Sequence, residues 1–407
     1  MTNQLTFIHA ADLHLDSPFK GLANLPEHIF SEVQKSTFQA VDRLVDVAID
    51  KKVDFVLLAG DLFDNERQSL KAQVTLRNGF ERLKAHGIHV YLSYGNHDHI
   101  NGNIHAIEYP ENVFRFPDET VRAYTFHKNG QPAAAIYGFS YENQAVLTNK
   151  SSEYQVQDES IPFHIAMLHG SLASNTEHDT YAPFQIGDLV DRGMDYWALG
   201  HIHQRAVLKE NPHVVYSGNT QGRHRKEMGE KGCYHVTLTE TGADLSFIPL
   251  QSIIFSPLSL DVSGCKNIDQ LEKYIKNHLE QQLKNSPQLI DLSLRSSENQ
   301  LSIWENEFVI EELIDIINDL FTKQKNWQYI YKVNVHKPVM KDVAALSESD
   351  HFIGELTRQI HDNTIQPYLK ELYQHRHARK YLEQLSETEQ ENVKQEAYDL
   401  LVNELLS

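Results

Sequence analysis

The first hundred residues alternate between short apolar runs and longer segments with helical spacing. The apolar runs LTFIHA (Leu5–Ala10), VDFVLLAG (Val53–Gly60) and IHVYLSYG (Ile88–Gly95) have the length of strands that are buried on both faces. Between them, Glu27–Lys52 and Ser69–His86 carry apolar residues three and four positions apart, as amphipathic helices do. Strands this apolar, with helices between them, predict an α/β fold whose parallel sheet is covered on both faces.

The pattern changes after Val113. As far as Leu250 the chain carries short strand-like runs, which predict a second sheet packed on the first, with helices outside. Pro257 follows the last of these runs and marks a domain boundary, after which strand and helix patterns alternate as βαβαβ. The end of the chain is rich in Glu, Gln, Leu and Lys with helical spacing. We therefore expect three parts, at residues 1–255, 256–340 and 341–407.

The composition excludes several classes of protein. No run of eighteen apolar residues occurs, and the start MTNQLTFIHAADLHLDS lacks the basic and apolar regions of a signal peptide, so we expect a soluble, cytoplasmic protein. Cys233 and Cys265 are the two cysteines, which rules out a disulfide framework and a thiolate zinc site. The net charge of −19 argues against broad, passive attraction to nucleic acid, although local basic segments or bound metals can still attract phosphate.

Polar clusters stand at the carboxyl ends of five predicted strands, where open α/β sheets bind their ligands. Any one of these histidines alone is more typical of packing or capping, and Asp12 or Asp61 alone of a helix N-cap. Together the carboxylates, imidazoles and one amide suit Mn, Fe or Zn better than Mg or Ca. The clusters are Asp12-Leu13-His14, Gly60–Asp64 (GDLFD), Gly95–Asp98 (GNHD), His169-Gly170 and Gly200–His203 (GHIH).

In this order the motifs D-x-H, G-D-x-x-D, G-N-H-D, a single H and G-H-x-H resemble those of the calcineurin-like metallophosphoesterases, over residues 1–203. The resemblance implies a four-layer αββα sandwich of two mixed sheets, with a two-metal centre. It places Asp12, His14, Asp61 and His203 around one metal, and Asp61, Asn96, His169 and His201 around the other. Two such ions clamp a phosphate and lower the pKa of a bound water, while a neighbouring acid protonates the leaving alcohol. His97 is our candidate for that acid.

Two further carboxylates in these motifs have a different expected role. Asp64 and Asp98 more typically orient a neighbouring ligand or fix a loop than bind metal themselves. Asp64 also stands where archaeal and eukaryotic relatives carry a histidine that handles the substrate backbone. Bacterial relatives carry an aspartate there too. The difference therefore puts in doubt a role of Asp64 in handling the substrate backbone, and it does not put the catalytic activity in doubt.

The segments HAADLHLDSPF, GDLFD, GNHD and YSGNTQG, with the small βαβαβ part and the helical tail, resemble the SbcD-type DNA repair exonucleases, in particular their YhaO branch. That resemblance implies a manganese-dependent 3′–5′ exonuclease and endonuclease in double-strand break repair, acting as a homodimer. In that family the small domain caps the active site and guides DNA. The helical tail docks on an SMC-like coiled-coil ATPase of the YhaN or SbcC type.

Two basic segments are candidates for contacts with DNA. Arg223, Arg225 and Lys226 follow the GHIH loop by one strand, either as a clamp on backbone phosphates or as a solvated turn. The stretch QHRHARKYLEQL (Gln374–Leu385) has a basic face that can grip DNA or a partner helix, and an ordinary surface helix is an equal alternative.

Two other functions compete with the nuclease. A stand-alone phosphodiesterase or phosphatase acting on a small nucleotide is favoured by the charge of −19 and disfavoured by the long extension beyond Pro257. A nonenzymatic scaffold that recruits an ATPase is disfavoured because the set of candidate ligands is complete.

Overall fold

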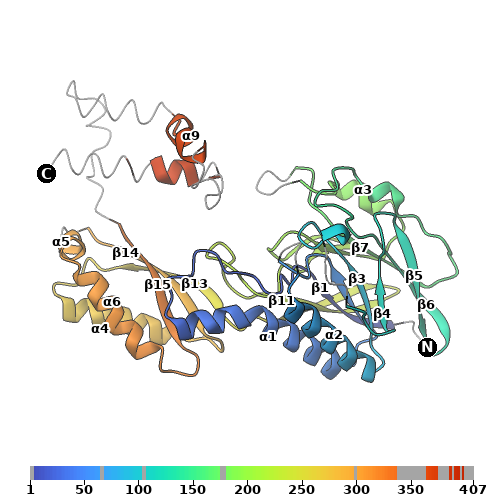
Figure 1. The fold of residues 1–407 in the computed structure, drawn as a ribbon, viewed down its shortest axis with the longest axis horizontal. Helices are drawn as coiled ribbons and strands as arrows, with labels where there is room; N and C mark the ends of the chain where they lie inside the picture. The colour runs from blue at the N-terminus through green and yellow to red at the C-terminus, as the bar shows by residue number, and fades with distance from the viewer. Residues whose placement is uncertain are drawn as a thin grey trace. The chain divides into compact units, whose positions relative to one another are not determined.

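The computed structural model describes residues 4–64, 68–102, 107–174, 180–297, 300–336 and 364–374, together with residues 385–386, 389–394 and 397. The chain divides into two compact units. The first consists of Met1–Leu258, Leu279–Asp291 and Asn318–Lys332. The second consists of Ser259–His278, Leu292–Ile317 and Val333–Ser407. Both six-stranded sheets described below belong to the first unit (Figure 1).

The first sheet has the strand order β12-β11-β1-β2-β3-β4. Strands β1 to β4 run parallel, β11 is antiparallel to β1, and β12 is antiparallel to β11, so the sheet is mixed. Its strands are β1 (Gln4–Ala10), β2 (Phe55–Ala59), β3 (His89–Ser93), β4 (Val113–Arg115), β11 (Gly232–Thr239) and β12 (Gly242–Pro249).

The second sheet has the order β5-β6-β7-β8-β10-β9. Its four central strands run parallel, whereas β5 and β9 are antiparallel strands at the two edges. Its strands are β5 (Arg122–Lys128), β6 (Gln131–Gly138), β7 (Phe163–His169), β8 (Tyr196–Gly200), β9 (Ala206–Glu210) and β10 (His213–Tyr216).

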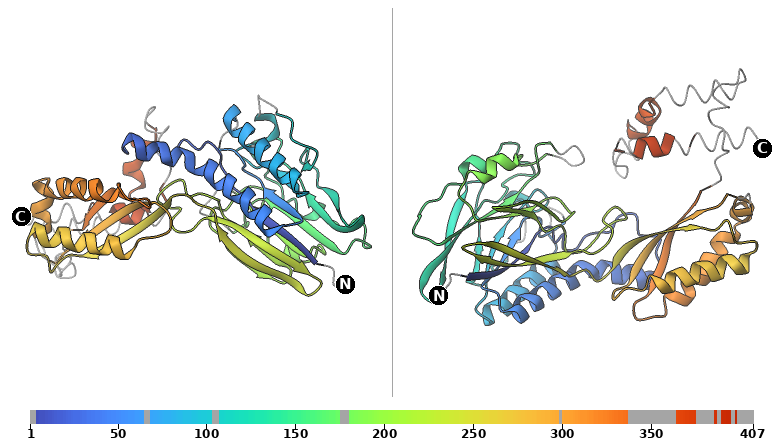
Figure 2. Two further views of the ribbon diagram at one scale, coloured as in Figure 1. Left: turned by 90° about the horizontal axis from the view of Figure 1, so that it is seen from below. Right: turned by 180° about the vertical axis from the view of Figure 1, so that it is seen from behind.

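Alternating side chains of β1 show how the layers pack. Leu5 and Phe7 point into the core between the two sheets, and Ile8 and Ala10 point into the core beneath the helices. Helices α1 (Glu27–Lys51) and α2 (Leu70–Ala85) cover this outer face side by side (Figure 2). The outer face of the second sheet is covered by loops with the short helices η2 (Ser151–Glu153) and α3 (Ile186–Val190). The predicted fold class, two mixed sheets flanked by helices, is confirmed.

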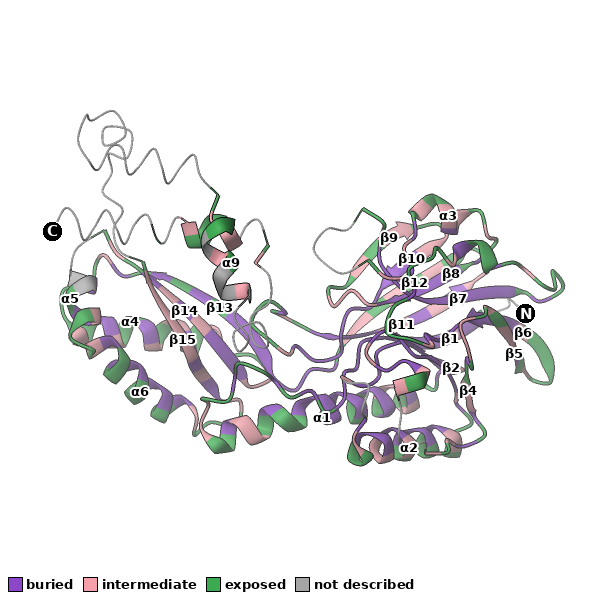
Figure 3. Ribbon diagram, turned by 45° about the horizontal axis from the view of Figure 1, so that its top comes forward, coloured by how far each residue is buried: buried purple, intermediate pink, exposed green. Residues whose placement is uncertain are grey.

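The two long helices begin and end where their sequences indicate. The Ser69 hydroxyl caps α2 by accepting a hydrogen bond from the Ala72 backbone N–H at 3.1 Å. Lys52 ends α1 in the left-handed conformation, with φ 53°. The buried residues lie along one side of each helix (Figure 3), so the packing of an apolar stripe stabilises both helices.

The remaining strands form a three-stranded sheet in the order β13-β14-β15. Pro257, which we expected to mark a domain boundary, lies inside β13, one residue before the first segment of the first unit ends at Leu258. β13 is an edge strand, where the missing N–H of an exposed proline breaks no ladder. The strands of this sheet and the helices between them are β13 (Ile254–Asp261), α4 (Ile268–Gln281), β14 (Gln288–Arg295), α5 (Gln300–Asn306), α6 (Val309–Phe321) and β15 (Gln328–His336). Elsewhere, in the first unit, the short helix η1 (Ile100–Gly102) follows β3.

Most of the predicted helical tail, residues 341–407, lies outside the described residues, and so does most of the basic stretch Gln374–Leu385. The described part includes helix α9 (Gln366–Gln374). Among the helices that the structure describes, none has the length and apolar character needed to cross a bilayer.

Candidate metal centre

The five polar clusters converge at the carboxyl ends of strands from both sheets. The parallel strands of each sheet all end at the same edge, which brings distant loops together. Asp12 and His14 follow β1, Asp61 and Asp64 follow β2, Asn96, His97 and Asp98 follow β3, His169 ends β7, and His201 and His203 follow β8.

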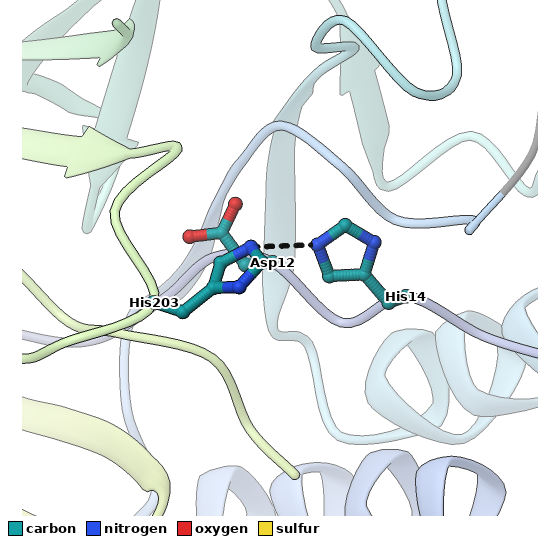
Figure 4. A group of neighbouring side chains, drawn as sticks. All are labelled: Asp12, His14 and His203. Carbon is teal, nitrogen blue, oxygen red and sulfur yellow. Dashed lines mark hydrogen bonds between the residues drawn. The ribbon is translucent and has the colours of Figure 1, made fainter. Parts of the chain in front are cut away.

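One group of candidate ligands consists of Asp12, His14 and His203, whose ligand atoms all lie within 4.8 Å of one another (Figure 4). The Nε2 atoms of His14 and His203 are 3.0 Å apart. Two imidazole nitrogens at this distance either share one proton or both face a cation. Burial lowers the pKa of His14 well below its usual range, and the charge of Arg223 adds to the lowering. His14 is therefore neutral, as a metal-binding imidazole must be.

A second group consists of Asp12, Asp61 and His169. The Asn96 side-chain oxygen joins it, at 3.0 Å from His169 Nε2 and 3.2 Å from His201 Nδ1. Asp61 Oδ2 lies 3.5 Å from His169 Nε2 and 3.8 Å from His14 Nε2. Asp61 thus lies near a ring nitrogen of each group, and Asp12 is the residue that the two groups share. The family resemblance implies that Asp61 is the bridging ligand.

The donor set fits a pair of divalent cations. Asp12 and Asp61 are almost fully buried, and burial raises the pKa of Asp12. Burial alone would also raise the pKa of Asp61, but its interactions with His169, His97 and His14 together outweigh burial and hold that pKa well below its usual range. Buried carboxylates beside buried imidazoles form an ion-binding site, because isolated charges are costly to bury. The His/Asp clusters are therefore consistent with a binuclear metal site.

The backbone around these residues is unusual in a way that serves the site. Asp12, His14, Asp61 and His201 have φ values of 52°, 43°, 51° and 95°, a region that costs non-glycine residues about 1–3 kcal/mol each. A Cβ on Gly95 would lie 2.4 Å from Asp61 Oδ1 and 2.6 Å from His169 Nε2. Glycine at this position lets the loop after β3 approach the ligands.

His97 lies beside both groups. Its backbone N–H donates to Asp61 Oδ1 at 3.0 Å, and its ring Nδ1 is 2.9 Å from the Asp64 carbonyl oxygen. A donating Nδ1–H leaves Nε2 as the atom that gains or loses a proton. The ring centroids of His97 and His14 are 4.9 Å apart. His97 also falls within 4.8 Å of ligand atoms of His14 and Asp61, so the geometry alone allows it to be a ligand as well as an acid.

Asp98 ties two of the ligand loops together. Its Oδ2 accepts hydrogen bonds from the backbone N–H groups of Leu62, at 2.6 Å, and Phe63, at 3.3 Å, and its Oδ1 accepts from Gly95 at 2.7 Å. Burial, with the charge of Asp61, raises the pKa of Asp98 to about 7. Its contacts are those of a residue that holds the loops after β2 and β3.

The three predicted phosphate contacts point in different directions. Arg223 is largely buried and forms an ion pair with Asp64 Oδ1, and its Nη2 lies 3.8 Å from Glu227 Oε1. Arg225 and Lys226, further along the same turn, are exposed. The structure thus brings Arg223 to the ligand shell and leaves Arg225 and Lys226 facing solvent.

Glu227 was missed by the sequence reasoning. It is 6% exposed, its Oε1 lies 2.6 Å from His203 Nδ1, and its Oε2 accepts from the Asn219 side-chain amide at 2.8 Å. Burial alone would raise the pKa of Glu227, but the hydrogen bond to His203 and the charges of His203, Arg223 and His224 together outweigh burial and hold this pKa well below its usual range. The one available signal was that Glu227 is the only acidic residue in the segment from Ser217 to Glu227.

A family model agrees with this arrangement. The model of the calcineurin-like phosphoesterases matches residues 5–205. Two mixed sheets with a His/Asp cluster at the ends of their strands define a metallophosphoesterase, and the chain belongs to the calcineurin-like phosphoesterase family. The family predicted from the motifs is confirmed.

Three relatives show how the similarity is distributed. The chain is 39% identical to the uncharacterized metallophosphoesterase YhaO of Bacillus subtilis (strain 168), over 100% of this chain and 99% of YhaO. It is 24% identical to the DNA double-strand break repair protein Mre11 of Methanosarcina acetivorans, over 88% of this chain and 56% of that protein. It is 23% identical to the SbcD subunit of the nuclease SbcCD of Escherichia coli (strain K12), over 66% and 74% of the two chains.

Proposed function

We propose that this metallophosphoesterase is a DNA exonuclease and endonuclease. It hydrolyses phosphodiester bonds in the 3′ to 5′ direction at a two-metal centre, with Mn²⁺ as the metal, during double-strand break repair in the cytoplasm. Two of its relatives are named as a DNA double-strand break repair protein and as part of a nuclease, and the similarity to the first extends over 88% of the chain.

In this proposal each candidate residue has one role. Asp12, His14, Asp61 and His203 hold one metal, and Asn96, His169 and His201 hold the other, with Asp61 shared between them. When bound, two divalent ions lower the pKa of water and neutralise charge on the phosphate. His97 gives a proton from Nε2 to the leaving alcohol oxygen, and Asp64 fixes the ring through its carbonyl. Asp98 and Asp64 orient the ligand loops.

The observation that carries the proposal is the position of His97 beside the ligands. A phosphodiester has a poor leaving group, so its hydrolysis gains from an acid fixed close to the metals. His97 is anchored at both its backbone N–H and its ring Nδ1, which leaves its Nε2 as the atom to face a substrate.

The experiment that tests the function compares two substrates. Metal-free protein is reloaded with Mn²⁺ and incubated with end-labelled duplex DNA or with a cyclic nucleotide. We expect the DNA to be shortened from its 3′ end, and His97→Ala to lose about 10²–10⁴-fold in rate, as for other general acids. His127→Ala, which removes an exposed histidine on β5, is the matched control. Undiminished cleavage by His97→Ala would overturn the proton-donor role.

The second candidate function is that of a stand-alone phosphodiesterase or phosphatase acting on a small nucleotide. The net charge of −19 favours it, because a polyanionic strand is repelled by an acidic protein. Cleavage of the cyclic nucleotide alone, with intact DNA, would establish this second function in place of the nuclease.

We further propose that the protein works as a homodimer with an SMC-like coiled-coil ATPase of the YhaN or SbcC type. In this proposal residues 256–340 cap the active site and guide DNA, and residues 341–407 dock on the ATPase. Deleting residues 347–407 should abolish copurification with the ATPase while Mn²⁺-dependent cleavage of bis(p-nitrophenyl) phosphate persists. Loss of both would assign the tail to the core fold.

A further inference from the structure

A cavity of about 260 Å³ lies beside the metal-ligand residue His203, in the first unit of the chain. Arg205 and Lys231 line it together with His203, Gly218, Asn219 and Glu230. The two basic residues come from different loops. Arg205 lies two residues beyond the GHIH motif, and Lys231 directly precedes β11. Two positively charged side chains therefore line the same cavity, in a chain whose net charge is −19.

Lys231 is a buried cation whose ammonium contacts a neutral oxygen. Its residue is 9% exposed, and its ammonium donates to the His203 carbonyl oxygen at 2.9 Å. The partner of this buried ammonium is a neutral carbonyl, whose partial charge offsets only part of the cost of burying a full positive charge. A buried ammonium normally faces a carboxylate or another anion.

Arg205 adds a second positive charge at the mouth of the cavity. Its guanidinium lies over the Phe247 ring, 3.8 Å from the ring centroid, and the side chain is exposed. Within the described ranges, no carboxylate lies within ion-pair distance of Arg205 or Lys231, and this includes Glu230 in the cavity wall. Glu227 and Asp12 are also near Lys231, and Glu227 is already hydrogen-bonded to His203 and Asn219.

The cavity is rigidly placed relative to the candidate metal centre. The His203 carbonyl accepts from the Asn219 backbone N–H at 3.3 Å as well as from Lys231. Gly218, with φ 73°, packs so closely that a Cβ there would lie 2.9 Å from Arg205 N and from the His203 carbonyl oxygen. His203 thus contributes its ring to the candidate metal centre and also lines the cavity.

We propose that this cavity is a subsite for a second phosphate group of the substrate, the one next to the scissile phosphodiester in a nucleic acid strand. The proposal rests on the nuclease function proposed above. An anion in the cavity pairs with the Lys231 ammonium and the Arg205 guanidinium, and it offsets the cost of burying Lys231. A strand carries such a phosphate at every linkage, whereas a cyclic nucleotide carries none beyond the bond that is cut.

The test uses two substrates that differ by one phosphate. A dinucleotide joined by a single phosphodiester is compared with the same dinucleotide carrying a terminal phosphate, at its 5′ end and separately at its 3′ end. In the wild type we expect the added phosphate at one of the two ends to lower KM about tenfold, as a contact with a charged group does. In Arg205→Gln and Lys231→Gln this ratio should fall toward one. Lys209→Gln, on β9 and away from the cavity, should keep it.

A second measurement does not depend on hydrolysis. In metal-free protein, broadening of the phosphorus resonance of inorganic phosphate reports binding, and we expect Arg205→Gln to reduce it and Lys209→Gln to leave it unchanged. If neither dinucleotide is cut but the broadening depends on Arg205, the nuclease function fails while an anion site in this cavity stands. Broadening that is equal in Arg205→Gln and wild type, or a KM ratio unaffected by Arg205→Gln, would overturn the subsite. Broadening that depends on Arg205 with no effect of the terminal phosphate on KM would assign the cavity to free phosphate and overturn the strand subsite.

Discussion

Glu227 Oε1 lies 2.6 Å from His203 Nδ1, on the side of the ring opposite to the Nε2 that faces His14. A carboxylate in this position fixes the tautomer and orientation of a metal-binding imidazole. The contact continues through Arg223, whose backbone N–H donates to Glu227 at 2.7 Å and whose guanidinium pairs with Asp64. Asp64 Oδ1 in turn lies 3.5 Å from His14 Nδ1. The rings of His14 and His203 are thus supported from behind by one connected set of charged groups.

Removing this carboxylate should weaken metal binding. We expect Glu227→Ala to lower the affinity for one of two Mn²⁺ ions by about 10–100-fold, the range found when such outer partners are removed. Titration calorimetry with Mn²⁺ measures both ions. Glu227→Gln keeps an oxygen that can accept from His203 and should lose less, and Glu240→Ala, an exposed residue in the β11–β12 turn, should lose nothing. Unchanged affinity in Glu227→Ala, or equal loss at both ions, would contradict the role.

Gly95 offers a steric test of the same centre. An alanine methyl there would lie 2.4 Å from Asp61 Oδ1, so one of the two must move. We expect Gly95→Ala to reduce Mn²⁺ affinity at least tenfold, because the displaced Asp61 lies near a ring nitrogen of each ligand group. Gly187→Ala, in helix α3 with open space around it, should bind Mn²⁺ normally and is the matched control. Normal Mn²⁺ binding by Gly95→Ala would show that Asp61 is not held where the structure has it.

His9 predicts how stability depends on pH. It is fully buried between the sheets, where its Nδ1 is 3.0 Å from the Tyr196 hydroxyl and its Nε2 is 3.2 Å from the Leu199 carbonyl oxygen. Burial lowers the pKa of His9 to about 3, from the usual 6.5. Between these values the unfolded chain binds a proton that the folded protein excludes. The contribution of neutral His9 is therefore complete above pH 6.5 and is lost as the pH falls toward 3.

Chemical unfolding at several pH values measures this effect. In the wild type His9 should account for a loss of roughly 1.4 kcal/mol in unfolding free energy per pH unit below about pH 6. His9→Gln removes the titration while keeping polar contacts, so its unfolding free energy should fall less steeply over the same range. The exposed variant His127→Gln should follow the wild type. Parallel curves for His9→Gln and the wild type would refute the explanation.

The sequence predicted those parts of the fold whose signals are local. Strands β1, β2 and β3 are largely buried and mostly apolar, and the polar clusters that follow them stand out against that pattern. The short edge strands β4 and β9 gave no such signal, because their residues are only partly buried or exposed. The edge strand β13 accepts Pro257 in its interior, because an edge strand tolerates a proline that a central strand rejects.

Contacts between distant residues could not be predicted in the same way. Arg223 and Asp64 are 159 positions apart, and their pairing depends on how two loops meet above different sheets. From the sequence alone, Arg223 was equivalent to Arg225 and Lys226, because all three are basic residues of one turn. Burial distinguishes them, and burial is a property of the folded chain.

This distinction gives the last prediction, on DNA binding without metal, where the strand is not cut. Each phosphate contact contributes about one unit to the slope of log affinity against log salt concentration. We expect the slope to fall by about one in Arg225→Gln and in Lys226→Gln, because both side chains are exposed. In Arg223→Gln the slope should stay unchanged while Mn²⁺ affinity falls, because the guanidinium is committed to Asp64 and Glu227. A slope reduced equally in all three variants would instead make Arg223 a phosphate contact, and would require its ion pair with Asp64 to open when DNA binds.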